Sequence, residues 1–177
     1  MTKTGDHRAR REHDGLRRIV GDALRRADPI GLMAMGAPSD EYDPELGTIL
    51  PLFTSVGSQA ELEKLIHSQF VAWFGADEAG PSGRYSSAAR EVWERWLVLE
   101  ARRLSGEEDV EVVPVESVEI RYDGRLIPAL TVIRTGTRYF VEARDAPGEW
   151  WMGEEQSEGC VAVWSSYGPH REAFAAH

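Results

Sequence analysis

The stretch SGEEDVEVVPVESVEIRYDGRL at residues 105–126 decides the fold, because the spacing of apolar residues changes within it. Before this stretch, apolar side chains recur every three or four residues, as on one face of a helix. Within it, Val118, Ile120 and Tyr122 alternate with polar residues, which is the period of a strand with one buried face. The sequence therefore predicts an α+β protein, with a helical part at 1–104 and a sheet part at 105–177. The connection between them is short, so they are either two domains or one fused domain.

Turn-forming residues divide the second part into strands. Asp123-Gly124 lies between alternating apolar residues and predicts a two-residue hairpin turn, after which 126–134 pairs back antiparallel. Further strands are expected at 139–144 and 160–165, with a long loop between them. The sequence HREAFAA near the end predicts a short helix. The expected sheet is an antiparallel meander of about four strands with a short terminal helix.

About four helices are expected in the first part. Apolar residues at helical spacing predict one over 14–27, and Asp43-Pro44 is typical of the start of a second. Ser58 and Glu61 have the capping-box spacing before the apolar face of a third helix, which Gly75 ends. Ser86 or Ser87 begins the fourth.

Length and composition indicate an ordinary globular protein. The chain has 177 residues, of which 42% are apolar and 28% charged, so a packed core needs no metal or disulfide. Cys160 is the single cysteine, which excludes an internal disulfide and favours a reducing compartment. No apolar run is long enough to cross a bilayer, and the first residues lack the apolar segment of a secretory signal. We therefore expect a cytoplasmic protein that does not contact a membrane.

The charge distribution predicts a basic partner. The formal net charge is −10, although residues 1–27 contain eight Lys or Arg against four acidic residues. An acidic surface attracts cations and repels polyanions, so a basic protein is the expected partner and nucleic acid is disfavoured. The arginines of residues 1–27 are interpreted as a solvated helix face, or as partners for acidic residues of the same or a neighbouring molecule.

The sequence contains no recognisable catalytic, nucleotide or metal motif. Its five histidines lack zinc-ligand spacing, its glycines do not match a phosphate loop, and no serine lies in a nucleophile elbow. Glu154, Glu155 and Glu158 could supply the paired carboxylates of a hydrolase, but a charged loop is the simpler interpretation. We therefore expect no cofactor and no metal ion, and lean towards a function that is not enzymatic.

An acidic segment is the first candidate site for a partner. Asp40, Glu41 and Asp43 surround Tyr42 within a few residues. Aromatic side chains carry much of the energy of protein interfaces, and charges steer the encounter. An acidic strip that presents Tyr42 is therefore a plausible contact site, and a solvated acidic rim is the alternative.

Two neighbouring tryptophans form the second candidate site. Trp150 and Trp151 point to opposite faces if the chain is extended, so one of them is expected to face solvent or a groove. The alternative is that the second ring folds over the edge of the sheet. Trp73, Trp93 and Trp96, which lie in the predicted helices, are expected in the core.

Residues 28–75 resemble a known group of proteins. The segments ADPIGL and APSDEYDPELGTIL, followed by a capped helix that ends in FVAWFG, are similar to a small family of bacterial proteins near the immunity proteins of toxin systems. The resemblance implies an inhibitory binding partner and carries no catalytic residue. The expected function is therefore protein binding. The alternative is an enzyme or small-ligand protein, with a pocket between sheet and helices lined by Trp150 or Trp164.

Overall fold

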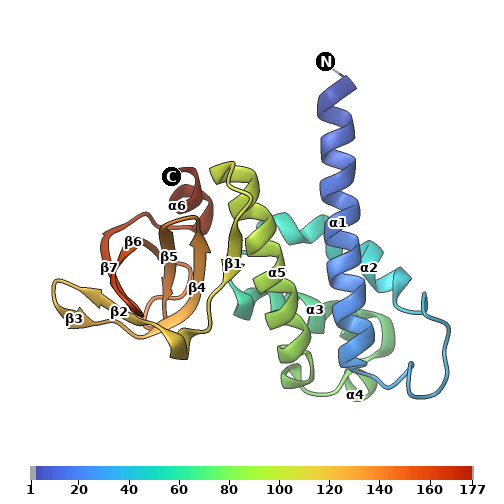
Figure 1. Ribbon diagram of the computed structural model, residues 1–177. Coiled ribbons are helices and arrows are strands. Elements are labelled where there is room, and N and C mark those ends of the chain that lie inside the picture. Colours follow the sequence, from blue (N-terminus) through green and yellow to red (C-terminus); the bar gives the residue numbers. More distant parts are fainter. Residues whose placement is uncertain (1–2, 177) are drawn as a thin grey trace. The chain divides into compact units, whose positions relative to one another are not determined.

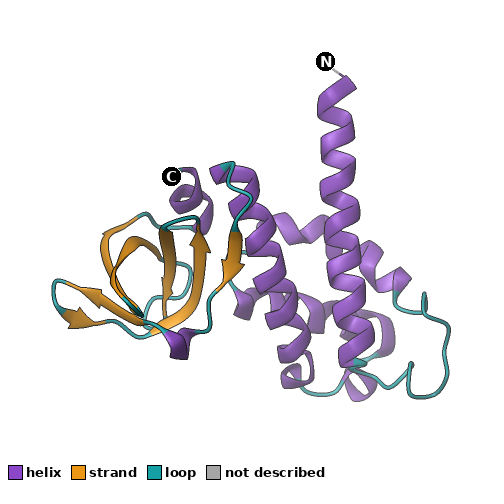
Figure 2. Cartoon of the chain, viewed as in Figure 1, coloured by secondary structure: helices purple, strands orange, loops and turns teal. Residues whose placement is uncertain are grey.

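The structure is a computed structural model that describes residues 3–176, with side chains described from His13 onward. It confirms an α+β protein, and the chain forms two compact units, Met1–Trp93 and Glu94–His177. The boundary between the units lies inside a helix, after Trp93. The sequence placed the change from helical part to sheet part later, after residue 104. All the described strands belong to the second unit, as Figure 2 shows. Each unit is described by itself below.

The first unit is built from helices and one long loop (Figure 1). Its elements are α1 (Lys3–Ala27), α2 (Asp43–Ile49), the 3-10 helix η1 (Leu50–Ser55), α3 (Gln59–Phe74), α4 (Ala76–Ala79), η2 (Ser82–Tyr85) and the first part of α5 (Ser86–Ser105). The helix α1 begins well before residue 14, because its arginine-rich start consists largely of good helix formers even without an apolar face. The loop at residues 28–42 connects α1 to α2.

The predicted ends of α3 are confirmed. The side chain of Ser58 accepts a hydrogen bond from the amide of Glu61, and Gly75 follows the helix with a φ of 83°. The carboxylate of Glu61 bonds to the amide of Gly57, one residue earlier than a capping box requires. Phe70, on the predicted apolar face of this helix, is fully buried.

Two of the three tryptophans expected in the core are there. Trp93 is fully buried and Trp96 nearly so. The prediction is wrong for Trp73, which is 50% exposed. The buried face of α3 follows Leu62, Ile66 and Phe70 at intervals of four residues, and Trp73 lies off that line.

The second unit contains one mixed sheet of seven described strands. They are β1 (Val110–Val112), β2 (Glu119–Tyr122), β3 (Arg125–Leu126), β4 (Ala129–Thr135), β5 (Arg138–Ala143), β6 (Trp150–Ser157) and β7 (Cys160–Ser166), in the spatial order β1-β4-β5-β6-β7-β2-β3. A 3-10 turn, η3 (Val115–Ser117), precedes β2. Neighbouring strands are antiparallel except β2 and β7, which are parallel with Ile120 opposite Val161. The predicted four-stranded meander is therefore wrong.

Local features explain how the sheet departs from the prediction. The Asp123-Gly124 turn forms as expected, with positive φ at both residues, and joins β2 to β3. Pro128 has no amide proton, so the expected strand at 126–134 breaks there, and β4 pairs with β1 and β5 instead of β2. The segment expected as a loop forms β6, which inserts between β5 and β7.

The sheet is curled, as Figure 1 shows. Buried apolar residues lie on both of its faces. One face holds a buried cluster formed by Ile120, Ala129, Val132, Tyr139, Val141, Val161 and Val163. The other face packs against α6 (His170–Ala175), the predicted terminal helix, where Phe174 meets Phe140 and Trp150 edge to face. Trp151 belongs to the first face, so the two neighbouring tryptophans point in opposite directions.

Candidate functional site

The side chain of Asp28 holds the loop between α1 and α2. Its carboxylate accepts hydrogen bonds from the amides of Met33 (3.0 Å) and Ala34 (2.9 Å) and from the hydroxyl of Tyr42 (2.6 Å). Asp28 has a φ of 42°, a left-handed conformation that Asp adopts more readily than most residues. Burial alone would raise the pKa of Asp28, but these hydrogen bonds bring it below its ordinary value. An ionised carboxylate therefore organises the loop.

Tyr42 is buried, and the prediction that the acidic strip presents its ring is wrong. Its exposed fraction is 0%, and its ring centroid lies 5.7 Å from that of Phe70 in α3. Burial, followed by the hydrogen bond to Asp28, raises the pKa of Tyr42 above its ordinary value. The ring anchors the loop to the helices and is not available to a partner.

The three acidic residues around Tyr42 have different surroundings. Asp40 and Glu41 are exposed, whereas Asp43 is half-buried. Asp43 accepts a hydrogen bond of 2.6 Å from the guanidinium of Arg17 in α1, which offsets its charge. Negative charge is therefore presented to solvent mainly by Asp40 and Glu41.

Met35, in the same loop, is the most exposed large apolar side chain among those described, at 73%. It directly follows the two residues whose amides bond to Asp28. Gly31 and Gly36 lie on either side of it with positive φ, a conformation that glycine adopts without steric cost. An exposed apolar side chain on an ordered backbone can be contacted by a partner with little loss of conformational entropy.

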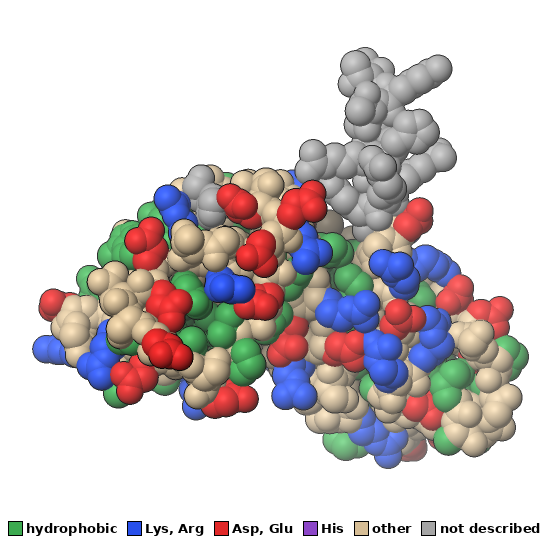
Figure 3. Space-filling view, viewed as in Figure 1, with side chains coloured by type: hydrophobic (Ala, Val, Ile, Leu, Met, Phe, Trp, Pro, Cys, Tyr) green, Lys and Arg blue, Asp and Glu red, His purple; other side chains and the backbone are tan. Residues whose placement is uncertain are grey.

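Three arginines of α1 pair with acidic side chains of the first unit, as the sequence allowed. Three ion pairs are formed, Arg17 with Asp43, Arg25 with Asp22 and Arg26 with Glu91. In Figure 3, blue side chains gather over this part of the surface with red ones among them. These ion pairs partly neutralise the positive charge of α1, which weakens its attraction for a polyanion.

Trp150 and Trp151 differ in exposure. Trp150 is fully buried, because its ring packs against His170 and Phe174 of α6, so its ring is not presented at the surface. Trp151 is half-buried, and its ring centroid lies 4.8 Å from that of Tyr122, which is 42% exposed. Trp151 is the member of the pair that reaches the surface.

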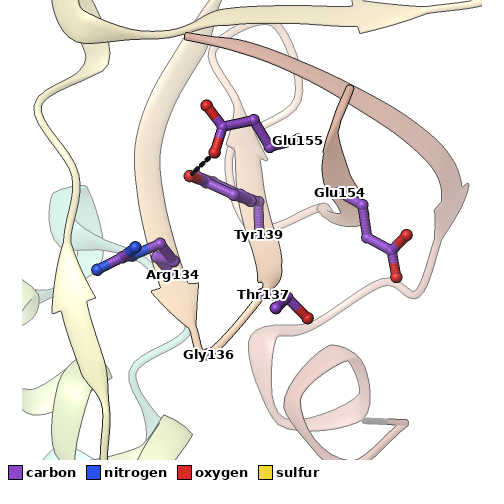
Figure 4. Close-up of a pocket in the computed structure, with 6 residues that line it drawn as sticks. All are labelled: Arg134, Gly136, Thr137, Tyr139, Glu154 and Glu155. Carbon is purple, nitrogen blue, oxygen red and sulfur yellow. Dashed lines mark hydrogen bonds between the residues drawn. The ribbon is translucent and has the colours of Figure 1, made fainter. Parts of the chain in front are cut away.

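A hollow of about 330 Å³ lies on the sheet of the second unit, lined by Arg134, Gly136, Thr137, Tyr139, Glu154 and Glu155. Figure 4 shows Glu155 turned towards Tyr139, whose hydroxyl donates a 3.1 Å hydrogen bond to it. Glu154 and Arg134 point away from this pair, and Arg134 forms an ion pair of 2.8 Å with Glu111. A catalytic centre requires polar groups that converge on one point, and the polar groups of this hollow do not.

Among the side chains that the structure describes, no group of three or more His, Cys, Asp or Glu is placed to hold a metal ion. The search for a helix of sufficient length and apolar character to cross a bilayer found none in the described part of the chain.

Comparisons with protein-family models, curated proteins and solved structures found no match. The resemblance of residues 28–75 to proteins near toxin-system immunity proteins therefore stays a prediction.

Sequence reasoning missed Asp28 and Met35. A signal was present, since Asp followed by Pro and then Gly two residues later is typical of a turn. The sequence did not show that the carboxylate of Asp28 bonds to amides five and six residues ahead. Met35 has no periodic pattern around it, so its exposure could not be predicted.

Proposed function

We propose that the protein binds another protein of basic character and acts as its inhibitor, in the manner of an immunity protein. The observation that carries the proposal is the loop at residues 28–42, which presents Met35 together with Asp40 and Glu41 while Asp28 fixes its backbone. This loop is called the contact loop below.

An ordered loop supports binding because less conformational entropy is lost when a partner docks. A flexible methionine adapts to an apolar depression on the partner, and apolar anchors at the centre of an interface supply most of its energy. Asp40 and Glu41 would lie at the rim, where charges steer the encounter and select the partner. The net charge of −10 adds attraction for a basic protein.

The sequence resemblance supports the same class of function. Its motifs ADPIGL and APSDEYDPELGTIL contain Asp28 and the acidic residues of the contact loop. Part of the resemblance therefore lies in residues that form and hold this loop, although Met35 itself is outside both motifs.

A small-ligand protein or enzyme is the alternative and has less support. Its expected marker was a cavity lined by Trp150 or Trp164. Trp150 is packed against α6, and neither residue lines the hollow beside Tyr139.

The test is affinity purification from the source cells with the wild-type protein and two triple variants. One variant, M35S/D40N/E41Q, removes the apolar tip and charges of the contact loop. The other, L52S/D77N/E78Q, makes the same chemical changes at exposed positions elsewhere in the first unit. Each recovered protein is then purified, and its affinity for all three forms is measured by titration calorimetry.

We expect a basic protein that binds the wild type and the control variant equally well. The contact-loop variant should bind it at least about tenfold more weakly, as truncation of an interface anchor generally does. Affinity should also decrease as salt is raised. Equal affinity of the contact-loop variant and the wild type for every partner would contradict the proposal.

A further inference from the structure

Glu45, in the first turn of α2, is buried although it belongs to an acidic segment. Its exposed fraction is 2%, and its Oε2 atom has no hydrogen-bond partner among the described residues. An ionised carboxylate is strongly disfavoured where it is neither hydrated nor paired. The buried position therefore favours the neutral form of Glu45.

The charged groups near Glu45 reinforce this preference. Burial is the main cause that raises the pKa of Glu45, and the negative charges of Glu41 and Asp43 raise it further, against an opposing hydrogen bond from its own backbone. On the facing side of α1, Arg17 is engaged by Asp43 and Arg25 by Asp22. Arg18 is exposed and lines the same surface hollow as Asp43 and Leu46.

Among the described residues, the other elements packed against α2 supply no hydrogen-bond partner to the Oε2 atom of Glu45. The 3-10 helix η1 contains no titratable residue. On α3, Lys64 is exposed to solvent. The other titratable groups of α3 form hydrogen bonds with other residues: Glu61 with Gly57, Glu63 with Ser82 and Ser86, and His67 with Gly80.

Glu45 is connected to the contact loop through one turn of helix. The carbonyl of Tyr42 accepts a 3.1 Å hydrogen bond from the amide of Leu46, so Tyr42 and Glu45 share the first turn of α2. The hydroxyl of the same tyrosine donates to Asp28, which holds the loop. A rearrangement of this turn would therefore move the anchor of the loop.

We propose that Glu45 makes the order of the contact loop depend on pH. When Glu45 is neutral, the first turn of α2 stays packed and Tyr42 remains bonded to Asp28. When Glu45 ionises, its carboxylate is drawn towards water, the first turn rearranges, and the bond from Tyr42 to Asp28 is weakened. The loop is thus more ordered at mildly acidic pH than above neutrality.

This inference concerns the free protein and stands whether or not the contact loop binds a partner. If the proposed function holds, it also implies tighter capture of the partner on the acidic side of neutrality, because the loop is then better preorganised.

The test is hydrogen exchange by NMR, followed at the amides of Met33 and Ala34, which donate to Asp28. Protection factors, corrected for the intrinsic effect of pH on exchange, are compared near pH 5.5 and near pH 7.5. In the wild type we expect protection to decrease severalfold as pH rises, because ionisation of Glu45 loosens the first turn of α2 and weakens the bond from Tyr42 to Asp28. Glu45→Gln and Glu45→Met should keep the same protection at both pH values.

Glu142→Gln is the matched control, because it neutralises a buried glutamate in the second unit. It should show the pH response of the wild type at Met33 and Ala34. Constant protection in the wild type, or an unchanged decrease in both Glu45 variants, would overturn the inference. Failure to find a protein partner would leave the exchange result unaffected.

Discussion

Two of the described glutamates are buried, Glu45 in the first unit and Glu142 in the second, and their surroundings differ. Glu142 is 0% exposed, and it accepts hydrogen bonds of 2.9 Å from the Thr131 hydroxyl and from the Gly148 amide. Glu45 has an oxygen without such a partner. Burial raises the pKa of both, although the hydrogen bonds of Glu142 oppose this effect. A buried carboxyl whose two oxygens both accept hydrogen bonds fastens its surroundings together, whereas one with an unpartnered oxygen is a local weakness.

The largest effect is expected when Glu142 is removed. Glu142→Ala deletes the acceptor for Thr131 and Gly148 and leaves a cavity, so stability should decrease by about 3 kcal/mol. Urea unfolding followed by tryptophan fluorescence measures the change. Glu149→Ala, at an exposed position close by, should have little effect. Similar midpoints for the two variants would show that Glu142 does not fasten the sheet.

The next largest effect concerns the anchor beside Glu45. Tyr42→Phe keeps the ring against Phe70 but removes the hydrogen bond to the carboxylate of Asp28, which should cost about 2 kcal/mol. Urea unfolding and the exchange of the Ala34 amide both report it. Tyr122→Phe changes an exposed tyrosine and serves as the control. If both variants match the wild type, Tyr42 is not the anchor of the contact loop.

A smaller effect is expected when Glu142 is made to resemble Glu45. Thr131→Val removes one donor, so stability should decrease by about 1 kcal/mol. It should decrease more near pH 8 than near pH 5.5, because loss of that donor raises the pKa of Glu142 further and disfavours the ionised form. Urea unfolding at both pH values tests this, with Thr137→Val at an exposed site as control. A pH-independent loss would contradict the assigned role of Thr131.

The smallest effect is a gain in stability. The raised pKa of Glu45 means that the folded protein retains this proton to higher pH than the unfolded chain. Its stabilising contribution is complete below the unfolded pKa and is lost as pH rises through the folded value. Glu45→Gln should therefore unfold at a higher urea concentration than the wild type near pH 7.5, and the difference should shrink as pH falls towards the unfolded pKa. Parallel pH profiles for the two proteins would refute the assignment.

The helices could be predicted because their signals are local. The cap at Ser58 and the stop at Gly75 lie within a few residues of the helix that they define. The sheet order could not, since the parallel pairing of Ile120 with Val161 joins segments far apart in the chain. The strand β6 was missed because its acidic second half interrupts the apolar alternation.

The candidate site was predictable only in part. Asp40 and Glu41 are exposed, as their charge indicates, and they remain in the proposed contact loop. The burial of Tyr42 depends on its bond to Asp28 and its contact with Phe70, which no local pattern encodes. Trp150 and Trp151 were expected on opposite faces, but which of them meets α6 depends on the register of β6.

Because β2 pairs with β7, the sheet cannot be completed during translation until the last strand has been synthesised. The β2–β3 hairpin emerges early and can close by itself around its tight turn, but its neighbour in the sheet is the last strand to be synthesised. Until then the nascent chain carries a ribbon with an unprotected edge, open to pairing with other chains. Translation arrested just before residue 160 should therefore yield a product prone to aggregation.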